Sequence, residues 1–514
     1  MLSEQDKQQL ASRGITESNF IKQYEQLKSN FIPAKLIAPA TTERGIICTT
    51  EKTVQYYINV YEDYSRDRDI VKFVPASGAA SRMFKDMFAC LAEMKEQPEN
   101  VTSIIDKYSK VKQIINQLEE LALFPDLEAS LDNKGLKLPQ LIHNKRYKEI
   151  IEEIVSPDGL NYGNLPKALL NFHNYGTYQR KAVDEHLVEG ALYAVNESGN
   201  VNIHFTISPE HEELFKSHLL KAIPFYEQKF GLTYGVTWSF QHPSTDTPAI
   251  DFKGNLLREN DGTLVFRPGG HGALIKNLNE IEGDLIFIKN IDNVTTDKLK
   301  SPTVDFKKVL AGILIEKEIT IKGNLSLLLE DECVQEDIQL IAEFVENDML
   351  VSLPPDFSQM ECNQKKRILI NKLNRPIRVC GMVKNEGEPG GGPFFVENNK
   401  GITSLQIVEG AQIDSGIESQ NNILNNSTHF NPVDIVAGTV DFLGRKFDLN
   451  DFVDNDTYMI AEKSKDGKPL NALELPGLWN GAMAGWITYF VEVPIETFSP
   501  VKEINDLLRP QHLV

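Results

Sequence analysis

The sequence predicts an α/β fold, because short apolar runs alternate with longer stretches that have a helical period. Runs rich in β-branched residues and bounded by turn residues predict buried strands, and apolar residues at a 3.6-residue period predict amphipathic helices. Two such runs are 70–74 (I-V-K-F-V) and 284–290, whose middle L-I-F-I is apolar. Strands and helices in alternation are typical of a sheet that is covered by helices.

An N-terminal helical segment is predicted over residues 1–65. Ser3 is expected to cap a polar helix that ends at Gly14, and Thr16 is expected to cap a second helix. A third helix is predicted at about Thr50–Tyr64, where apolar residues follow one face.

The α/β core is predicted over 66–345, and a C-terminal α/β region over 346–514. The first core strand, 70–74, runs into a loop of small residues at 76–81, and the stretch at about 90–160 has only helical periodicity. Further core elements are predicted as a hairpin of strands 191–195 and 201–207, a helix at about 209–230, strands at 235–241, 263–267 and 284–290, and a helix that begins near Gly272. In the C-terminal region, strands are predicted at 377–383 and 404–408, on either side of the glycine-rich stretch 386–393, a mobile loop or a place of close backbone approach.

Composition excludes several classes of function. A formal net charge of −20 argues against a nucleic-acid groove, which needs a basic surface. The cysteines and histidines lack the spacing of a zinc site, so no structural zinc is expected. No apolar run reaches the ~18–20 residues that span a bilayer, and the first residues lack the apolar core of a secretory signal. We therefore expect a cytoplasmic protein without a membrane partner.

The loop 76–81 is the first candidate for a ligand site. A strand, a small-residue loop and a helix in this order form an anion site, because backbone N–H groups at the start of the helix point at the ligand. Arg82 and Lys85 follow the loop and add positive charge. The alternative is a tight strand–helix turn without a ligand.

The segment V-P-A-S-G-A-A-S-R-M-F-K at 74–85 resembles the signature loop P-A-G-G-x-G-T-R-M of nucleotide-sugar pyrophosphorylases. L-P-K-A-L-L at 165–170 is similar to the P-K-P-L-L motif of the same superfamily, although about 80 residues separate it from the loop. The resemblance implies a nucleotide-diphospho-sugar-transferase-like mixed sheet flanked by helices, with the helical stretch at about 90–160 as an insertion between two halves of one site.

Three more segments resemble the same enzymes in matching order. F-R-P-G-G-H-G-A-L at 266–274 is similar to the P-x-G-x-G-G segment of uridine-diphosphate N-acetylhexosamine pyrophosphorylases, which implies a loop against the base and sugar; the alternative is a hairpin exit turn. I-K-N-I-D-N-V at 288–294 resembles their V-D-N segment, which implies that Asp292 binds Mg²⁺; the alternative is a capped turn. E-T-F-S-P-V-K at 496–502 resembles F-S-P-L-K-N, which implies that Lys502 binds phosphate and that the C-terminal region folds back on the core.

Over nearly its full length, the chain is identified as a member of the family recorded as domain of unknown function 4301. The segments that carry this resemblance are 172–193, 378–394 and 427–434. They and neighbouring segments contain polar residues that a buried core would not favour. These second-rank site candidates are His186, Glu189, His204, Gln241, Thr245, Asp246, Arg378, Lys384, His429 and Asp434.

The function that these resemblances imply is a Mg²⁺-dependent nucleotidyltransferase. It would join a nucleoside triphosphate to a phosphorylated small molecule, such as a sugar 1-phosphate, and release pyrophosphate. The expected catalytic residues are Arg82, Lys85, Lys167 and Lys502, and the expected nucleotide-binding residues are Ala76, Ser77, Gly78, Ala79, Ala80, Ser81, Gln241, Gly269, Gly270, His271 and Gly272. Two alternatives stay open: an ATP-dependent kinase that acts on a small metabolite, and a non-catalytic protein that binds a nucleotide sugar.

Overall fold

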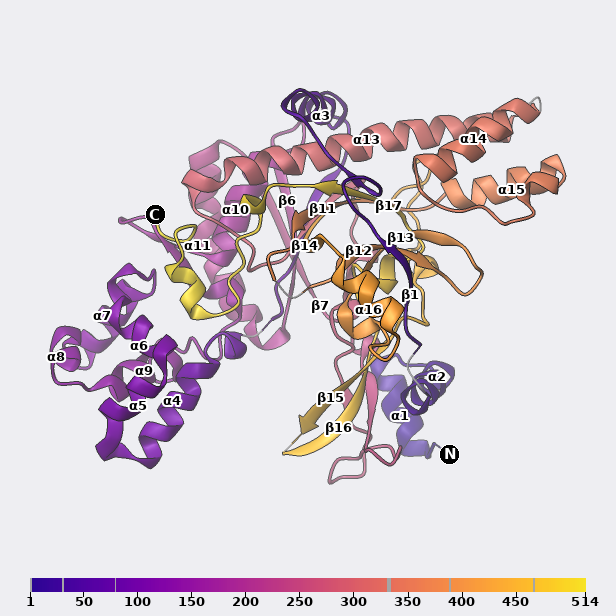
Figure 1. Cartoon of the computed structure of the whole chain (residues 1–514). Coiled ribbons are helices and arrows are strands. Elements are labelled where there is room, and N and C mark those ends of the chain that lie inside the picture. Colours follow the sequence, from indigo (N-terminus) through magenta and orange to yellow (C-terminus); the bar gives the residue numbers. More distant parts are fainter. Residues whose placement is uncertain (1, 30–31, 79, 331–333, 388–389, 466) are drawn as a thin grey trace. The chain divides into compact units, whose positions relative to one another are not determined.

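The computed structural model describes the chain except for residues 1, 30–31, 79, 331–333, 388–389 and 466. The chain forms two compact units. Unit 1 comprises Met1–Phe73, Gln241–Ile288 and Phe306–Ile495, and unit 2 comprises Val74–Phe240, Lys289–Asp305 and Glu496–Val514. Figure 1 labels the helices and strands of both units.

Unit 1 contains a mixed sheet, as the predicted fold class requires. Its strand order is β2 (Ile46–Ile47), β17 (Ile487–Glu492), β11 (Ile377–Lys384), β14 (His429–Gly438), β10 (Leu285–Lys289) and β3 (Ile70–Pro75). β17 pairs in parallel with both β2 and β11, β11 and β14 are antiparallel, and β10 and β3 are parallel. β3 and β10 are buried along nearly their whole length, so these two predicted strands lie inside a core.

The helices of unit 1 include the three that the first 65 residues predict: α1 (Glu4–Arg13), α2 (Glu17–Lys28) and α3 (Glu51–Tyr64). Ser3, Thr16 and Thr50 cap them as expected, and Gly14 ends α1 in the left-handed conformation. The prediction that 1–65 is helical throughout is wrong, because β1 (Lys35–Pro39) and β2 lie between α2 and α3. β1 is a strand because it pairs with β12 (Gly392–Glu397), which lies some 350 residues further along the chain.

The rest of unit 1 comprises small sheets and helices. β12 continues into β13 (Thr403–Val408), and a separate sheet has the order β15 (Met459–Lys465), β16 (Lys468–Glu474), β8 (Thr247–Ile250) and β9 (Phe266–Arg267). The strand predicted at 263–267 is thus reduced to its last two residues. The remaining helices are α12 (Ile275–Asn279), most of α13 (Ser301–Leu329), α14 (Gln335–Asn347), α15 (Cys362–Leu373) and α16 (Glu418–Asn425).

Unit 2 contains the helical stretch predicted at about 90–160. Its helices are α4 (Lys85–Glu96), α5 (Val101–Lys107), α6 (Ser109–Asn116), α7 (Phe124–Asn133), α8 (Leu138–His143) and α9 (Tyr147–Val155), which gather into one group (Figure 1). Apolar side chains of this group pack in the same core as those of β6 (Asn200–Ile207). β6 and β7 (Thr233–Phe240) are parallel, and α11 (Glu212–Phe230) lies between them in the sequence, which confirms the predicted strand–helix–strand order.

The predicted strand at 191–195 is wrong. Ala182–Tyr193 forms α10, and only Val195 makes an antiparallel bridge, to Val201. A short apolar run is compatible with either a strand or a buried helix, and α10 is buried along most of its length. Gly190 explains the close packing of this helix, since a Cβ there would lie 2.7 Å from a methyl carbon of Val201. The hairpin of β4 (Asn171–Asn174) and β5 (Gln179–Lys181) before α10 was not predicted.

In the described part of the chain, no helix is both long and apolar enough to cross a membrane.

Candidate functional site

The loop that follows β3 is anchored by hydrogen bonds at the carboxyl end of β6. Ala76 N–H donates to Thr206 O (2.9 Å), and Ser208 Oγ donates to Ser77 O (3.1 Å). Gly78 is exposed, and open space lies where a Cβ would stand. A 3₁₀ turn at Ala80–Arg82 precedes α4, with Ala80 buried and Ser81 exposed. Ala79, which the sequence also assigned to this site, lies outside the described residues.

The L-P-K segment at 165–167 lies against this loop. Ala80 N–H donates to Leu165 O (3.2 Å), and Lys167 N–H donates to Gly78 O (3.3 Å). The helices α4–α9 occupy the chain between these two segments. The chain therefore comes back to the loop after the helical stretch, and two backbone hydrogen bonds join the loop to residues 165–167.

The side chain of Lys167 connects the loop region to two more segments. Its Nζ donates to Asp292 Oδ2 (2.7 Å) and to Val501 O (2.8 Å). Lys502 Nζ lies 3.6 Å from the same Asp292 oxygen. The side chains of Lys167 and Asp292 are 13% and 11% exposed, whereas that of Lys502 is 56% exposed. One carboxylate is thus shared by a buried ammonium group and by one that faces solvent.

The segment that carries Lys502 is fixed by backbone contacts. Asn293 and Pro500 form an antiparallel bridge, Val501 N–H donates to Asp292 O (3.0 Å), and Ser499 N–H donates to Asn293 Oδ1 (2.8 Å). Beyond it, Asp506 accepts from Lys502 N–H (2.8 Å). Lys502 therefore extends from a well-supported backbone toward Asp292.

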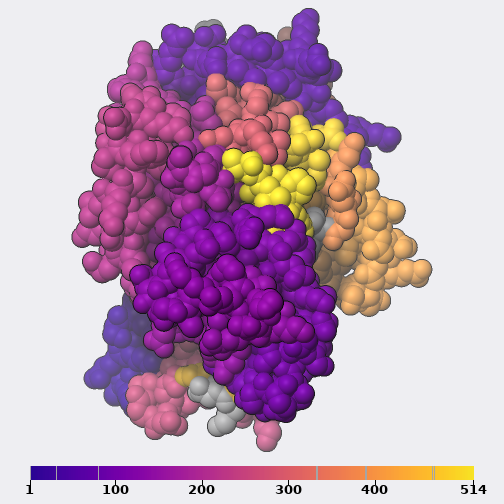
Figure 2. Space-filling view, turned by 90° about the vertical axis from the view of Figure 1, so that its left-hand side faces the viewer, coloured from indigo at the N-terminus to yellow at the C-terminus, as the bar shows by residue number. Residues whose placement is uncertain are grey.

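Arg82 and Lys85 are exposed, and neither forms an ion pair or a side-chain hydrogen bond with any residue that the structure describes. Both line a hollow of about 140 Å³ in unit 2. The other polar side chains that line it are Asp86, Lys110, Glu503 and Asn505. In Figure 2, the yellow C-terminal residues lie beside the purple residues of the helical stretch.

The glycine-rich segment 269–272 belongs to unit 1, where it packs against residues 475–479. Leu475 N–H donates to Gly269 O (2.9 Å), and a Cβ at Gly272 would stand 2.1 Å from Pro476 O. Gly270 has a φ of +77°. Close backbone packing within unit 1 is therefore sufficient to require these glycines.

His271 is stacked on Trp479, with 4.3 Å between ring centroids, and its Nδ1 accepts from Leu478 N–H (3.1 Å). Burial lowers the pKa of His271 to about 4, so the imidazole is neutral at physiological pH. Gln241, also expected to bind the nucleotide, is half-buried and belongs to unit 1.

Most of the second-rank candidates have partners within the fold, and two of them form buried ion pairs. Glu189 pairs with Lys289 (2.8 Å), and Asp434 pairs with Lys307. The contacts of the others are His186 with Ile291 O, His204 with Thr237 and Ser239, Asp246 with Arg13, Thr245 with His242 O, Arg378 with Thr488 and Trp479 O, and His429 and Lys384 with Glu492. These contacts explain how the residues fit into the fold, and a role for any of them in a site stays a prediction.

A buried polar network in unit 2 was not predicted. Glu185 accepts from Lys300 Nζ (2.5 Å) and contacts His173 Nδ1 (2.8 Å), and Arg180 contacts both Glu185 (3.2 Å) and Asp297 (2.6 Å). Burial alone would raise the pKa of Glu185, but Lys300, His173 and Arg180 hold it well below its usual range. The sequence signal was the cluster of charged residues at 179–189, which an exposed helix would also explain.

His512 joins this network near the end of the chain. Its Nδ1 lies 2.9 Å from His173 Nε2, and burial is the main reason why its pKa falls to about 3. Gln511 O accepts from Thr295 Oγ1 (2.9 Å) and Thr296 N–H (3.3 Å). The end of the chain thus supports the segment that follows Asp292.

The sequence profile of the domain of unknown function DUF4301 matches residues 3–513. The chain belongs to this family. A search of curated protein sequences finds no match to the chain. Among solved structures, the DUF4301 protein is similar to a mutant UDP-glucose pyrophosphorylase from Leishmania major, with 13% identity, a TM-score of 0.45 and coverage of 99% of this chain and 79% of that one. It is also similar to the uridine diphosphate N-acetylglucosamine pyrophosphorylase from Trypanosoma brucei, with 12% identity, a TM-score of 0.47 and the same coverage.

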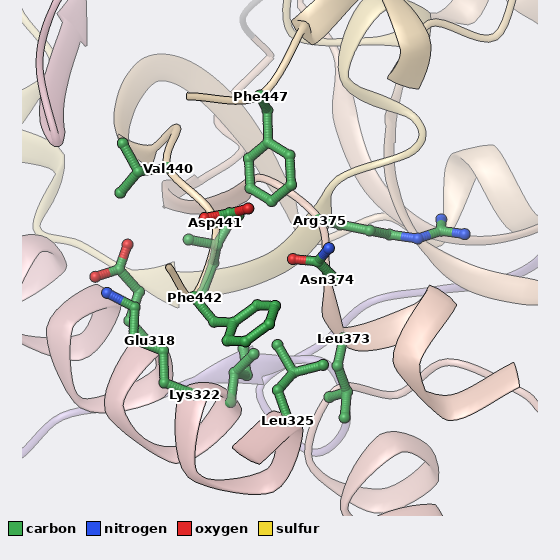
Figure 3. A pocket seen from close by; sticks show the side chains of 12 residues that line it. Glu318, Lys322, Leu325, Leu373, Asn374, Arg375, Val440, Asp441, Phe442 and Phe447 are labelled. Atoms are coloured by element: carbon green, nitrogen blue, oxygen red, sulfur yellow. The ribbon is translucent and has the colours of Figure 1, made fainter. Parts of the chain in front are cut away.

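Unit 1 of the DUF4301 protein has a second hollow, between α13, the end of α15 and residues 440–447 (Figure 3). Its volume is about 20 Å³, which is enough for about one water molecule. A nucleotide does not fit there.

The polar groups around Asp292 can be tested against the needs of Mg²⁺. Mg²⁺ is usually bound by one or two carboxylates together with water and substrate phosphates. Within the described ranges, no group of three His, Cys, Asp or Glu side chains could hold a metal ion. Asp292 supplies one carboxylate, and Lys502 at 3.6 Å is the partner that could move away. These residues fit an ion that arrives with nucleotide phosphates better than one that the protein binds by itself.

Proposed function

We propose that this DUF4301 protein is a nucleotidyltransferase that joins a nucleoside triphosphate to a phosphorylated small molecule and releases pyrophosphate. The observation that carries the proposal is the meeting of four segments in unit 2. The loop at 76–82, Lys167, Asp292 and Lys502 are joined by hydrogen bonds and ion pairs, although up to 334 residues separate the groups that touch. Their order along the chain is the order in the pyrophosphorylase motifs that the sequence resembles.

The proposed reaction requires positioning and charge neutralisation more than a covalent nucleophile. A phosphate oxygen of the acceptor, such as a sugar 1-phosphate, attacks the α-phosphorus of the nucleoside triphosphate. A P–O bond forms there, the bond from the α-phosphorus to the bridging oxygen breaks, and pyrophosphate leaves with the electron pair. The reaction needs cations at both the reacting and the leaving phosphates.

The four candidate catalytic cations form two groups, one for the reacting phosphates and one for the leaving phosphates. Lys167 and Lys502, which share Asp292, would neutralise the acceptor phosphate and the α-phosphate. Arg82 and Lys85, which have no acidic partner among the described residues, would neutralise the leaving pyrophosphate. The exposed backbone at Gly78 leaves room for a phosphate beside the loop.

Asp292 has a positioning role in this proposal, because its carboxylate orients both lysine side chains. It would also hold Mg²⁺ together with phosphate oxygens, and the ion would supply further neutralisation of charge on the triphosphate. That Gln241 and residues 269–272 contact a base or sugar stays a separate prediction about unit 1.

The test is to incubate the protein with each nucleoside triphosphate, a panel of sugar 1-phosphates and Mg²⁺, and to identify the products. Pyrophosphate and a nucleotide sugar are expected, and Lys167→Met should abolish both. Lys112→Met is the control, because Lys112 is exposed and its ion-pair partner among the described residues is Asp106. Nucleoside diphosphate as the product would establish the kinase alternative, and tight binding of a nucleotide sugar without turnover would establish the binding-protein alternative.

A further inference from the structure

The hollow in unit 2 is formed jointly by the start of α4, by α6 and by the C-terminal segment. α6 contributes Lys110, Val111 and Ile114, and the C-terminal segment contributes Glu503, Ile504 and Asn505. Asn505 Nδ2 donates to Lys110 O (3.0 Å), and Ile504 N–H donates to Met83 O (3.4 Å). The volume of about 140 Å³ is several times what one water molecule needs. The helical stretch therefore forms one wall of a space beside Arg82.

The charges around the hollow favour an anion. Three cations, Arg82, Lys85 and Lys110, face two carboxylates, Asp86 and Glu503. One of these carboxylates is already used, because Glu503 forms an ion pair with Lys110. Arg82 and Lys85 pair with no side chain that the structure describes. Two cations are thus available to a ligand, and a third becomes available when Glu503 releases it.

Glu503 also has a fixed place relative to the catalytic candidate Lys502. The carboxylate of Asp506 accepts from both Lys502 N–H and Glu503 N–H (2.8 Å each). The two side chains therefore leave adjacent points of one rigid turn: Lys502 extends to Asp292, and Glu503 extends to Lys110. A change of partner at Lys110 would occur next to the reacting phosphates.

We propose that the helical insertion supplies Lys110 as a third cation of a diphosphate-binding subsite, and that Glu503 holds Lys110 until the anion arrives. The anion then replaces the Glu503 carboxylate and is bound by Arg82, Lys85 and Lys110. The identification of the natural anion as the pyrophosphate product rests on the proposed function. The subsite itself does not, because its affinity for an inorganic anion can be measured without any reaction.

Isothermal titration of the full-length protein with inorganic pyrophosphate tests the subsite. Lys110→Gln should weaken binding about tenfold, which is the usual effect of losing one charge-assisted contact. Glu503→Gln should tighten binding about two- to fivefold, because the anion no longer competes with an exposed ion pair. Lys112→Gln, on the same helix but outside the hollow, should bind pyrophosphate as the native protein does.

Lys110 and Glu503 are each about half exposed, so the variants are expected to fold, and melting temperatures check this. Lys110→Arg, which keeps the charge, should restore most of the affinity. Equal affinities in the native protein, Lys110→Gln and Glu503→Gln would overturn the proposal, and so would absence of pyrophosphate binding. Pyrophosphate binding with these effects but without nucleotidyl transfer would reject the proposed function and retain the subsite. Transfer activity that is unaffected by Lys110→Gln would reject the subsite and retain the proposed function.

Discussion

The ion pair of Lys167 and Asp292 gives the sharpest test of the candidate site. We expect Lys167→Met and Asp292→Asn to be strongly non-additive in their effects on the free energy of unfolding. With 2.7 Å between Nζ and Oδ2 and an effective dielectric constant of about 20, the gross attraction is about 6 kcal/mol. Loss of water from two side chains that are nearly nine-tenths buried offsets most of this. A net coupling of about 2 kcal/mol remains.

The two single variants are expected to differ in their free energy of unfolding, because each leaves a different partner of the ion pair buried. Lys167→Met leaves a buried carboxylate whose remaining cation is Lys502 at 3.6 Å, and we expect a cost of about 3 kcal/mol. Asp292→Asn leaves Lys167 its hydrogen bond to Val501 O (2.8 Å), so about 2 kcal/mol is expected. The double variant should then lose about 3 kcal/mol instead of about 5.

The assay is hydrogen exchange of unit 2 peptides across a urea series, because the chain has two units and a single global transition is not assured. Peptides around 165–170 and 290–296 report the relevant opening reaction. Costs that simply add in the double variant would show that the two groups do not form the pair, and with it the central argument for the site would fail.

Three further predictions use the same kinds of measurement. Gly78→Ala places a methyl group in open space, so it should change the free energy of unfolding by no more than about 0.5 kcal/mol while reducing the nucleotide-induced rise in melting temperature. Gly272→Ala places a Cβ 2.1 Å from Pro476 O and should lower the free energy of unfolding by about 3 kcal/mol. An equal loss in both variants would contradict the close packing at Gly272. Arg82→Ala should abolish the nucleotide-induced rise without changing the unfolding free energy by more than about 0.5 kcal/mol, and a preserved rise would remove Arg82 from the site. Burial is the main cause that lowers the pKa of His512 to about 3, so its contribution to stability is present above about pH 6.5 and is lost as pH falls. At pH 4.5 the loss is about 2.7 kcal/mol. Hydrogen exchange of unit 2 peptides across a urea series at both pH values should show that His512→Leu removes this pH dependence.

The elements that the sequence predicts correctly have local causes. The helices α1 and α3 begin at Ser3 and Thr50, whose side chains cap the first backbone N–H groups. The strand at 70–74 is apolar on both sides because β3 is buried on both faces. Patterns of this kind need no information from distant parts of the chain.

The elements that it misses have distant causes. Lys35–Pro39 forms a strand because β12 pairs with it, and the residues 35–39 by themselves do not indicate this partner. Ala182–Tyr193 is a helix, although the sequence predicts a strand that begins near its end. The apolar residues of this helix are buried inside unit 2 on more than one side. A buried helix lacks the amphipathic period by which helices are recognised.

The candidate site shows the same division. Arg82 and Lys85 follow a small-residue loop, so a local argument finds them. Lys167, Asp292 and Lys502 could be grouped only through their resemblance to known motifs, because backbone pairing of remote segments brings them together. Lys110 had neither signal: it is one lysine on a polar helix, and only the fold brings it to the hollow.

The arrangement of the loop suggests why its sequence can depart from the glycine-rich form of the motif. Among the described residues, three backbone hydrogen bonds hold it together with one from the Ser208 hydroxyl to the carbonyl of Ser77. Ala76, Ser77, Gly78 and Ala80 make these contacts with backbone groups, which another small side chain would leave in place. Ala80 is buried and Gly78 is open to solvent. A larger residue at position 80 is therefore expected to disrupt the fold, whereas one at 78 is expected to affect only the proposed ligand.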